Sequence, residues 1–167
     1  TGELPSHPEL LDELALRLCE HGSVKQLVRE MASSSAYRQA SGSNLRGDGI
    51  DLENRLLGRA ERKRLEAECL YDAMLAVSGE LDLSVGGSTI PPGKTADYGY
   101  SHEGRRRALY IPVFRNALPP IFIAFDFADP SLVVGQRFTS TVAPQALYLM
   151  NNPFVRDRAE AAAKRIL

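Results

Sequence analysis

Apolar residues recur at helical spacing wherever Pro and Gly are scarce in this sequence. Residues 24–31 carry Val, Leu, Val and Met at positions i, i+3, i+4 and i+7, directly after the candidate N-cap Ser23. Upstream, Ser6 and Glu9 have the spacing of a capping box, and the leucine-rich residues 10–18 follow them. These patterns predict two consecutive helices joined by a tight turn.

The longest predicted helix covers residues 62–79. At about 100° per residue, its apolar face consists of Leu65, Cys69, Ala73, Ala76 and Val77. Glu66 falls in the middle of this face, where an unpaired carboxylate is costly. We therefore expect Glu66 to pair with Arg62, which lies one turn back on the same side.

The flank of this helix carries Arg64, Glu68 and Asp72 at positions i, i+4 and i+8. The spacing predicts a ladder of structural ion pairs that the helix carries into a core. The alternative is a divalent cation shared by Glu68 and Asp72, because hard carboxylate oxygens suit Ca²⁺ or Mg²⁺. The arginine beside the two acids favours the ladder.

Shorter apolar segments predict further helices at residues 52–57, 120–125, 145–150 and 153–166. Apolar and polar residues alternate at 81–85 and 107–113, which is typical of strands. We expect these two segments to pair, with the Pro- and Gly-rich residues 88–104 between them as a long flap. The predicted fold class is mainly α: a helical domain with a minor two-stranded antiparallel β element and long loops.

The composition sets limits on size and partners. With 167 residues, 44% of them hydrophobic, the chain can bury one core, so we expect a single domain over residues 1–167. Its 20 basic and 21 acidic residues nearly cancel, which argues against a nucleic-acid partner. No apolar run of about 18 residues occurs, so no membrane span is expected. The start at Thr1, without Met, indicates an excised piece of a longer protein.

Standard catalytic and cofactor signatures do not occur in the sequence. The histidines His7, His21 and His102 have no ligand spacing and are interpreted as cap, turn or solvated residues. Nucleophile-elbow, zinc-protease, phosphate-loop and dinucleotide patterns are missing, so we expect no cofactor and no metal site. Cys19 and Cys69 are interpreted either as two separate buried thiols or as one disulfide.

A few carboxylates are weak catalytic candidates. Besides Glu68 and Asp72, the sequence has Asp126 and Asp129 in a turn before Pro130, where they could bind a metal or activate water. Asp in such a turn more often hydrogen-bonds the nearby backbone, which favours a structural role.

Five arginines stand beside apolar or aromatic residues, not in charge runs: Arg38, Arg55, Arg64, Arg115 and Arg137. Such arginines often pair with buried carboxylates. The candidate partners are Glu66, Glu68, Asp72 and Asp126. A network of this kind is mostly architectural. A cleft lined by the same groups would also bind sugar hydroxyls or an anionic ligand, and the pattern does not separate these two roles.

A second cluster consists of the weak ligand-binding candidates Tyr98, Tyr100, Arg105, Arg106 and Arg107. Consecutive arginines next to aromatic rings could bind sulfated or phosphorylated ligands. The alternative is the solvated end of a loop.

Several motifs occur in an order that is found in a known family, at residues 6–12, 35–39, 54–57, 64–68, 72–75, 78–79, 125–127 and 141–154. Together they resemble the PSD family, a domain of unknown function in large planctomycete proteins, over nearly the whole chain. Tyr71 and Gly58 depart from its pattern, which commonly has an Arg and an aromatic residue at those places.

The resemblance implies that this chain is the C-terminal part of a larger multi-domain protein. That parent would be an exported bacterial protein, located in the periplasm or at the cell surface, with a cytochrome c module elsewhere. The implied partners are the other domains of that parent, with polysaccharide as a further candidate. Our leading hypothesis is a non-catalytic structural or interaction module. The alternatives are a polysaccharide-active hydrolase or lyase that uses Asp126 or Glu68 as acid or base, and a carbohydrate-binding module that uses the Tyr–Arg cluster.

Overall fold

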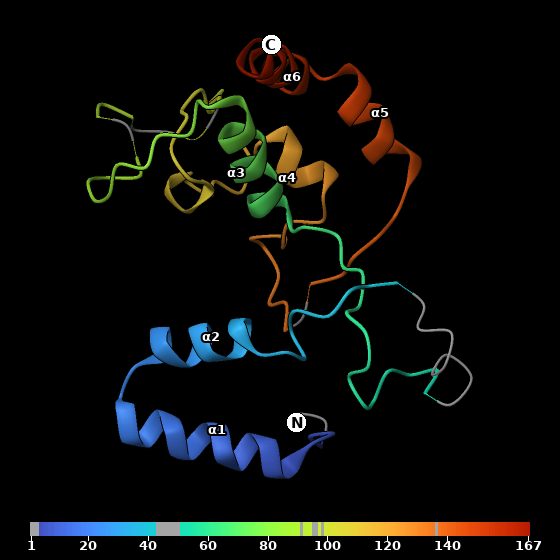
Figure 1. Cartoon of the computed structure of the whole chain (residues 1–167). Helices are drawn as coiled ribbons and strands as arrows, with labels where there is room; N and C mark the ends of the chain where they lie inside the picture. Colours follow the sequence, from blue (N-terminus) through green and yellow to red (C-terminus); the bar gives the residue numbers. More distant parts are fainter. Residues whose placement is uncertain (1–3, 43–50, 91, 95–96, 98, 136) are drawn as a thin grey trace. The chain divides into compact units, whose positions relative to one another are not determined.

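The computed structural model describes residues 4–42, 51–90, 92–94, 97, 99–135 and 137–167. In these residues the regular structure consists of six α-helices and one short 3-10 helix (Figure 1). Over the same residues, no helix combines the length and the apolar character needed to cross a membrane. The chain divides into two compact units, Thr1–Lys63 and Arg64–Leu167. The mainly α fold class is confirmed, and a single domain over residues 1–167 stays a prediction.

The first unit contains a helical pair, α1 (Pro8–His21) and α2 (Val24–Ser33), as the apolar spacing predicted (Figure 1). Gly22 ends α1 in the left-handed conformation, with a φ of 60°, where a residue without Cβ is not strained. Ser23 then caps α2, because its Oγ accepts the N–H of Gln26. The local signals in the sequence are therefore sufficient to specify this turn.

Two local predictions in the first unit are wrong. The capping box of α1 is not formed, since His7 is the N-cap residue and the Ser6 hydroxyl is hydrogen-bonded to the His7 ring at 2.9 Å. No helix forms at residues 52–57, because Asn54 takes a left-handed φ of 53°. The Asp51 carboxylate accepts two backbone N–H groups, four and five residues ahead. These contacts close a turn instead of starting a helix.

The second unit is built around α3 (Ala67–Ser78), which is green in Figure 1. It packs against α4 (Pro120–Ala124), α6 (Pro153–Ile166) and the 3-10 helix η1 (Ala108–Tyr110), while α5 (Ala143–Asn151) packs against α4 and α6. The core consists of Ala67, Tyr71, Leu75, Ala108, Ile111, Ile121, Phe122 and Phe125. All of these residues belong to the second unit.

The buried face of α3 differs from the predicted one. The buried residues are Ala67, Tyr71, Leu75 and Ser78. On the predicted face, Leu65 is 51% and Val77 is 61% exposed. Apolar residues occur around most of this helix, so spacing alone does not select one face. Packing against α4 and α6 selects it.

The start of α3 and the state of the cysteines also differ from expectation. The helix begins at Ala67 and not at residue 62, with Glu66 as its extended N-cap residue. Cys19 and Cys69 are both exposed free thiols, which corrects the prediction of buried ones.

The predicted two-stranded antiparallel element is not formed in the described residues. The bridge found there is an isolated one between Asp82 and Arg106, the residue just before segment 107–113, and it is parallel. The Asp82 carboxylate accepts hydrogen bonds from the N–H and the hydroxyl of Ser84, which bends the first segment. The second segment coils into η1. Alternation over about five residues is too weak a signal to outweigh these local contacts.

The C-terminus of α3 is held by α6. Gly79 follows the helix with a φ of 78°, and a Cβ at this position would lie 3.3 Å from Cδ of Arg165. Arg165 Nη1 donates hydrogen bonds to the carbonyls of Ala76 at 3.1 Å and Val77 at 3.2 Å. Carbonyl groups in the last turn of α3 are thus bound by a side chain from another helix.

Candidate functional site

Asp126 follows α4 closely and lies in a polar cluster of the second unit. Its Oδ2 accepts hydrogen bonds from Arg64 Nη2 at 2.6 Å and from the Ser140 N–H at 2.8 Å, and the Ser140 hydroxyl donates to Oδ1 at 2.9 Å. Arg64 Nη1 donates to the Ser140 carbonyl and to Oε1 of Gln145. Arg64, which the sequence predicts to pair with a carboxylate, thus binds Asp126 from a distant part of the chain.

These contacts hold the Asp126 carboxyl in its ionised form. The hydrogen bond from Arg64, followed by that from the Ser140 N–H, lowers the pKa of Asp126 to about 2. The Arg64 guanidinium also lies over the Phe125 ring, 5.6 Å from its centroid. A carboxyl group this acidic has no proton to donate near neutral pH.

Glu66 and Glu68 share one arginine. Arg137 Nη1 lies 3.3 Å from Glu66 Oε2 and 2.8 Å from a carboxylate oxygen of Glu68, and the guanidinium lies 5.0 Å from the centroid of the Phe127 ring. Arg62, the expected partner of Glu66, donates from Nε to the Ser41 hydroxyl instead. The partner differs because α3 starts after Glu66, so the one-turn spacing to Arg62 is not helical.

Asp72, the last member of the predicted ladder, is a positioning group for the η1 segment. Its Oδ1 accepts the N–H of Ala108 at 2.6 Å, and its Oδ2 lies 3.6 Å from Arg107 Nε. Asp129 accepts the N–H of Ser131 at 2.8 Å, as expected of Asp in a turn. Among the described residues, no group of three or more His, Cys, Asp or Glu could hold a metal ion.

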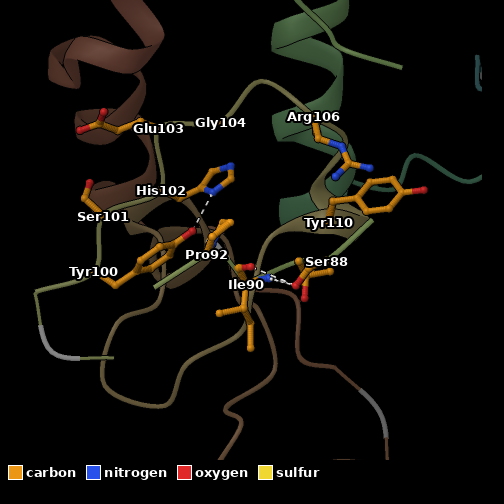
Figure 2. A pocket seen from close by; sticks show the side chains of 11 residues that line it. Ser88, Ile90, Pro92, Tyr100, Ser101, His102, Glu103, Gly104, Arg106 and Tyr110 are labelled. Atoms are coloured by element: carbon orange, nitrogen blue, oxygen red, sulfur yellow. Dashed lines mark hydrogen bonds between the residues drawn. The ribbon is translucent and has the colours of Figure 1, made fainter. Parts of the chain in front are cut away.

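Residues that connect α3 to α4 in the sequence form a groove of about 500 Å³ (Figure 2). It is lined by Ser88, Thr89, Ile90, Pro92, Tyr100, Ser101, His102, Glu103, Gly104, Arg106 and Tyr110. Tyr100 and Arg106, two of the ligand-binding candidates, are thus brought together. Arg105 and Arg107 are not among the lining residues, and Tyr98 lies outside the described residues.

His102 forms part of one side of the groove, next to Tyr100 (Figure 2). Its Nδ1 lies 3.3 Å from the Tyr100 hydroxyl, and its ring is tilted against the Tyr71 ring at a centroid distance of 6.1 Å. Burial lowers the pKa of His102 below its usual value of 6.5, so the ring is neutral at pH 7. Its Nε2 is buried and has no hydrogen-bond partner in the described part of the chain.

Arg106 and Tyr110 form the opposite side of the groove (Figure 2). The Arg106 guanidinium stacks on the Tyr110 ring, 3.7 Å from its centroid. Its Nη2 donates to the carbonyls of Ser84 at 3.1 Å and Gly86 at 2.6 Å, and the Tyr110 hydroxyl accepts the N–H of Gly86 at 3.0 Å. This wall is fixed by the backbone that it binds.

Gly104 connects the groove to the core of the second unit. The buried Tyr71 donates its hydroxyl hydrogen to the Gly104 carbonyl at 2.6 Å. A Cβ at Gly104 would lie only 2.8 Å from Cε1 of His102, so the imidazole can occupy its place only beside a glycine. Burial also raises the pKa of Tyr71 to about 12, which keeps its hydroxyl protonated.

Nine of the eleven lining residues, among them His102, Gly104 and Tyr110, were not recognised as site residues in the sequence. One signal was present: Tyr100 and His102 are spaced i, i+2, which places two side chains on one side of an extended segment. The contribution of Tyr110 depends on the fold of the loop and has no local signature.

The structure is mainly helical. Its candidate catalytic carboxylates form ion pairs or backbone contacts, and the groove is separate from them. The chain belongs to the PSD1 family, described as a protein of unknown function (DUF1553), whose family model matches residues 1–167. No curated protein and no solved structure matches the chain. The resemblance to the PSD family is thereby confirmed.

Proposed function

We propose that this domain is a non-catalytic interaction module of a larger exported bacterial protein. One observation carries the proposal: Asp126, Glu68 and Asp72 each already bind an arginine or a backbone N–H at 2.6–2.8 Å. Groups held in this way position parts of the fold relative to each other.

The protonation state of Asp126 supports the proposal. A carboxyl that acts as a general acid needs a pKa raised toward the working pH. The pKa of Asp126 moves the other way, to about 2, because Arg64 binds its charged form. Arg64 and Arg137, which could otherwise bind an anionic substrate, are engaged in these pairs.

A carbohydrate-binding module is the second candidate, and the groove favours it. Tyr100 and Arg106, two residues of the Tyr–Arg cluster, line the same groove together with further aromatic and hydroxyl side chains. Aromatic rings combined with a few polar groups are a common composition of small-molecule sites.

The proposed partners are the other domains of the parent chain, and the proposed location is the periplasm or the cell surface. Membership of the PSD1 family supports both, through the resemblance to planctomycete proteins with a cytochrome c module. Any electron transfer would then belong to that module.

The catalytic alternative is tested by incubating the chain with neutral, uronic and sulfated polysaccharides and measuring newly formed chain ends. We expect no turnover by the wild type. Turnover that disappears in Glu68→Gln or Asp126→Asn but persists in the control Asp129→Asn would overturn the non-catalytic assignment. The interaction itself is tested by calorimetric titration with the remaining domains of the parent, where the absence of any binding would contradict it.

A further inference from the structure

Arg106 differs from its two neighbours in the arginine run because no carboxylate in the described part of the chain lies at ion-pair distance from its guanidinium. Arg105 Nη1 lies 2.8 Å from Glu80, and Arg107 Nε lies 3.6 Å from Asp72. Arg106 has no acidic side chain at ion-pair distance in the described residues, and its contacts are backbone carbonyls and the Tyr110 ring. These contacts orient the guanidinium without neutralising it.

The acids nearest to the groove leave this charge largely uncompensated. The pKa of Asp82 is lowered most by the hydrogen bond from the Ser84 N–H and least by the charge of Arg106. Asp82 is therefore bound mainly by Ser84. Glu103 lines the groove, but Figure 2 shows its side chain directed away from His102 and Arg106. A second cation is present, since Lys94 Nζ lies 5.3 Å from the centroid of the Tyr100 ring. Arg106, the cationic side chain that lines the groove, can therefore bind an anionic group.

The rest of the wall suits a ligand that is more than a simple anion. Ile90, Pro92 and the Tyr100 ring provide apolar surface, while Thr89 and Ser101 provide hydroxyl groups. The neutral His102 adds no charge to this wall. A volume of about 500 Å³ lies within the range of small-molecule sites, roughly 300–1,000 Å³.

We infer that the groove binds an acidic sugar unit, with its carboxylate or sulfate group on Arg106 and its ring between Tyr100 and Tyr110. A sugar ring combines apolar C–H faces with several hydroxyls, and the acidic group matches the uncompensated guanidinium. The inference rests on the proposed interaction function and names the ligand of that module.

The test is calorimetric titration of the full chain with three oligosaccharides of equal length: an oligogalacturonide, a sulfated galactan fragment and a neutral maltooligosaccharide. We expect at least one acidic ligand to bind about tenfold or more tightly than the neutral one, since one charge-assisted contact is worth that factor. Its affinity should fall as salt is raised. The acidic ligand that binds identifies carboxylate or sulfate as the recognised group. Equal affinities for acidic and neutral ligands, or no binding by any of the three, would overturn the inference.

Arg106→Gln and Arg105→Gln form a matched pair, because both remove one positive charge from the same run and only Arg106 lines the groove. We expect Arg106→Gln to lose about tenfold or more in affinity, and Arg105→Gln to stay within about twofold. Arg106→Lys keeps the charge but not the planar fork, so its affinity should lie between those of the two Gln variants. This variant serves as a check in case Arg106→Gln perturbs the loop. Equal losses in the Gln variants would contradict the assignment.

Failure of this inference is distinct from failure of the proposed function. If the chain binds no saccharide but does bind the other domains of its parent, only the assignment of the groove is wrong. If the chain cleaves the acidic ligand and Asp126→Asn abolishes the cleavage, the non-catalytic assignment is wrong. The affinity of the groove for the ligand would then be retained.

Discussion

Asp126 shows how a single residue can combine backbone and side-chain requirements. It has a φ of 59°, a region that Asp and Asn adopt more readily than most residues. In this conformation its carboxylate binds Arg64 and Ser140 together. Asn also adopts this backbone conformation readily but has no charge. Asn at position 126 therefore separates the role of the backbone conformation from that of the carboxylate.

We expect Asp126→Asn to lower the free energy of unfolding by about 2 kcal/mol at pH 7. The estimate follows from the folded pKa of about 2 against an ordinary 3.8, with each unit worth about 1.4 kcal/mol. Because the pKa is lowered, this stability is present above about pH 4 and is lost as the pH falls through about 2. Urea unfolding of wild type and variant at pH 7, 4 and 2.5 should show the difference shrinking.

Asp129→Asn is the control for this prediction. Asp129 lies in the same turn region, and its bond to Ser131 is a backbone contact. Its substitution should change stability by less than about 0.5 kcal/mol. A loss as large as that of Asp126→Asn, or a pH-independent difference for Asp126→Asn, would contradict the role of the Arg64 pair.

Gly104 makes the position of His102 testable. In Gly104→Ala the new Cβ would lie 2.8 Å from the imidazole, which must move out of its half-buried place. Since burial lowers the pKa of His102, we expect that pKa to rise toward 6.5 in the variant. An NMR titration of the imidazole Cε1 proton measures it. Gly135→Ala, where a Cβ meets nothing within 4 Å, is the control and should leave the titration unchanged.

Among the elements, α3 is central to the second unit because α4, α6 and η1 all pack against it. Tyr71 stacks on Phe154 of α6 at 5.3 Å and reaches Gly104 beside the groove. Asp72 on the same helix holds η1 through Ala108. One helix thus supports both the core and the segment that carries the groove.

The contact between Arg165 and the end of α3 predicts a measurable stabilisation. Arg165→Ala removes two hydrogen bonds to the carbonyls of Ala76 and Val77, and should cost about 1 kcal/mol because these groups are partly reached by water. Lys164→Ala, in the same helical turn, removes only an exposed ion pair to Glu160 and should destabilise the fold less than Arg165→Ala does. Denaturant unfolding of both variants compares them. Equal costs would mean that Arg165 does not cap α3.

At the scale of the whole molecule, burial is distributed unequally between the two units. Neither α1 nor α2 contains a buried residue, whereas α3 contains four. All hydrophobic residues of the core cluster belong to Arg64–Leu167. Since buried apolar area provides most of the stability of a fold, the second unit carries most of it here.

We therefore expect residues 64–167 to unfold cooperatively on their own. A fragment of these residues should show a sigmoidal thermal transition, because its core is complete within the fragment. A fragment of residues 1–63 should melt gradually, since its helices have little buried surface to stabilise them. Circular dichroism on both fragments and the full chain measures this. A gradual melt of residues 64–167 would contradict the assignment.

The ends of several helices follow from the sequence alone, because their signals are local. Ser23 before α2, Asn152 before α6 and Gly79 after α3 act within a few residues of themselves. The sequence also indicated that arginines beside apolar residues would meet carboxylates. That expectation depends on residue chemistry and not on knowing the partner.

Which side chains meet depends on how distant segments pack. Arg64 binds Asp126 across 62 positions of sequence, and Glu66 binds Arg137 instead of its neighbour Arg62. The buried face of α3 was likewise selected by α4 and α6, since that helix is apolar on several sides. The groove around His102 exists because Tyr71 in the core holds Gly104 in place. Such contacts depend on the packing of distant segments, and a one-dimensional pattern contains no distances between them.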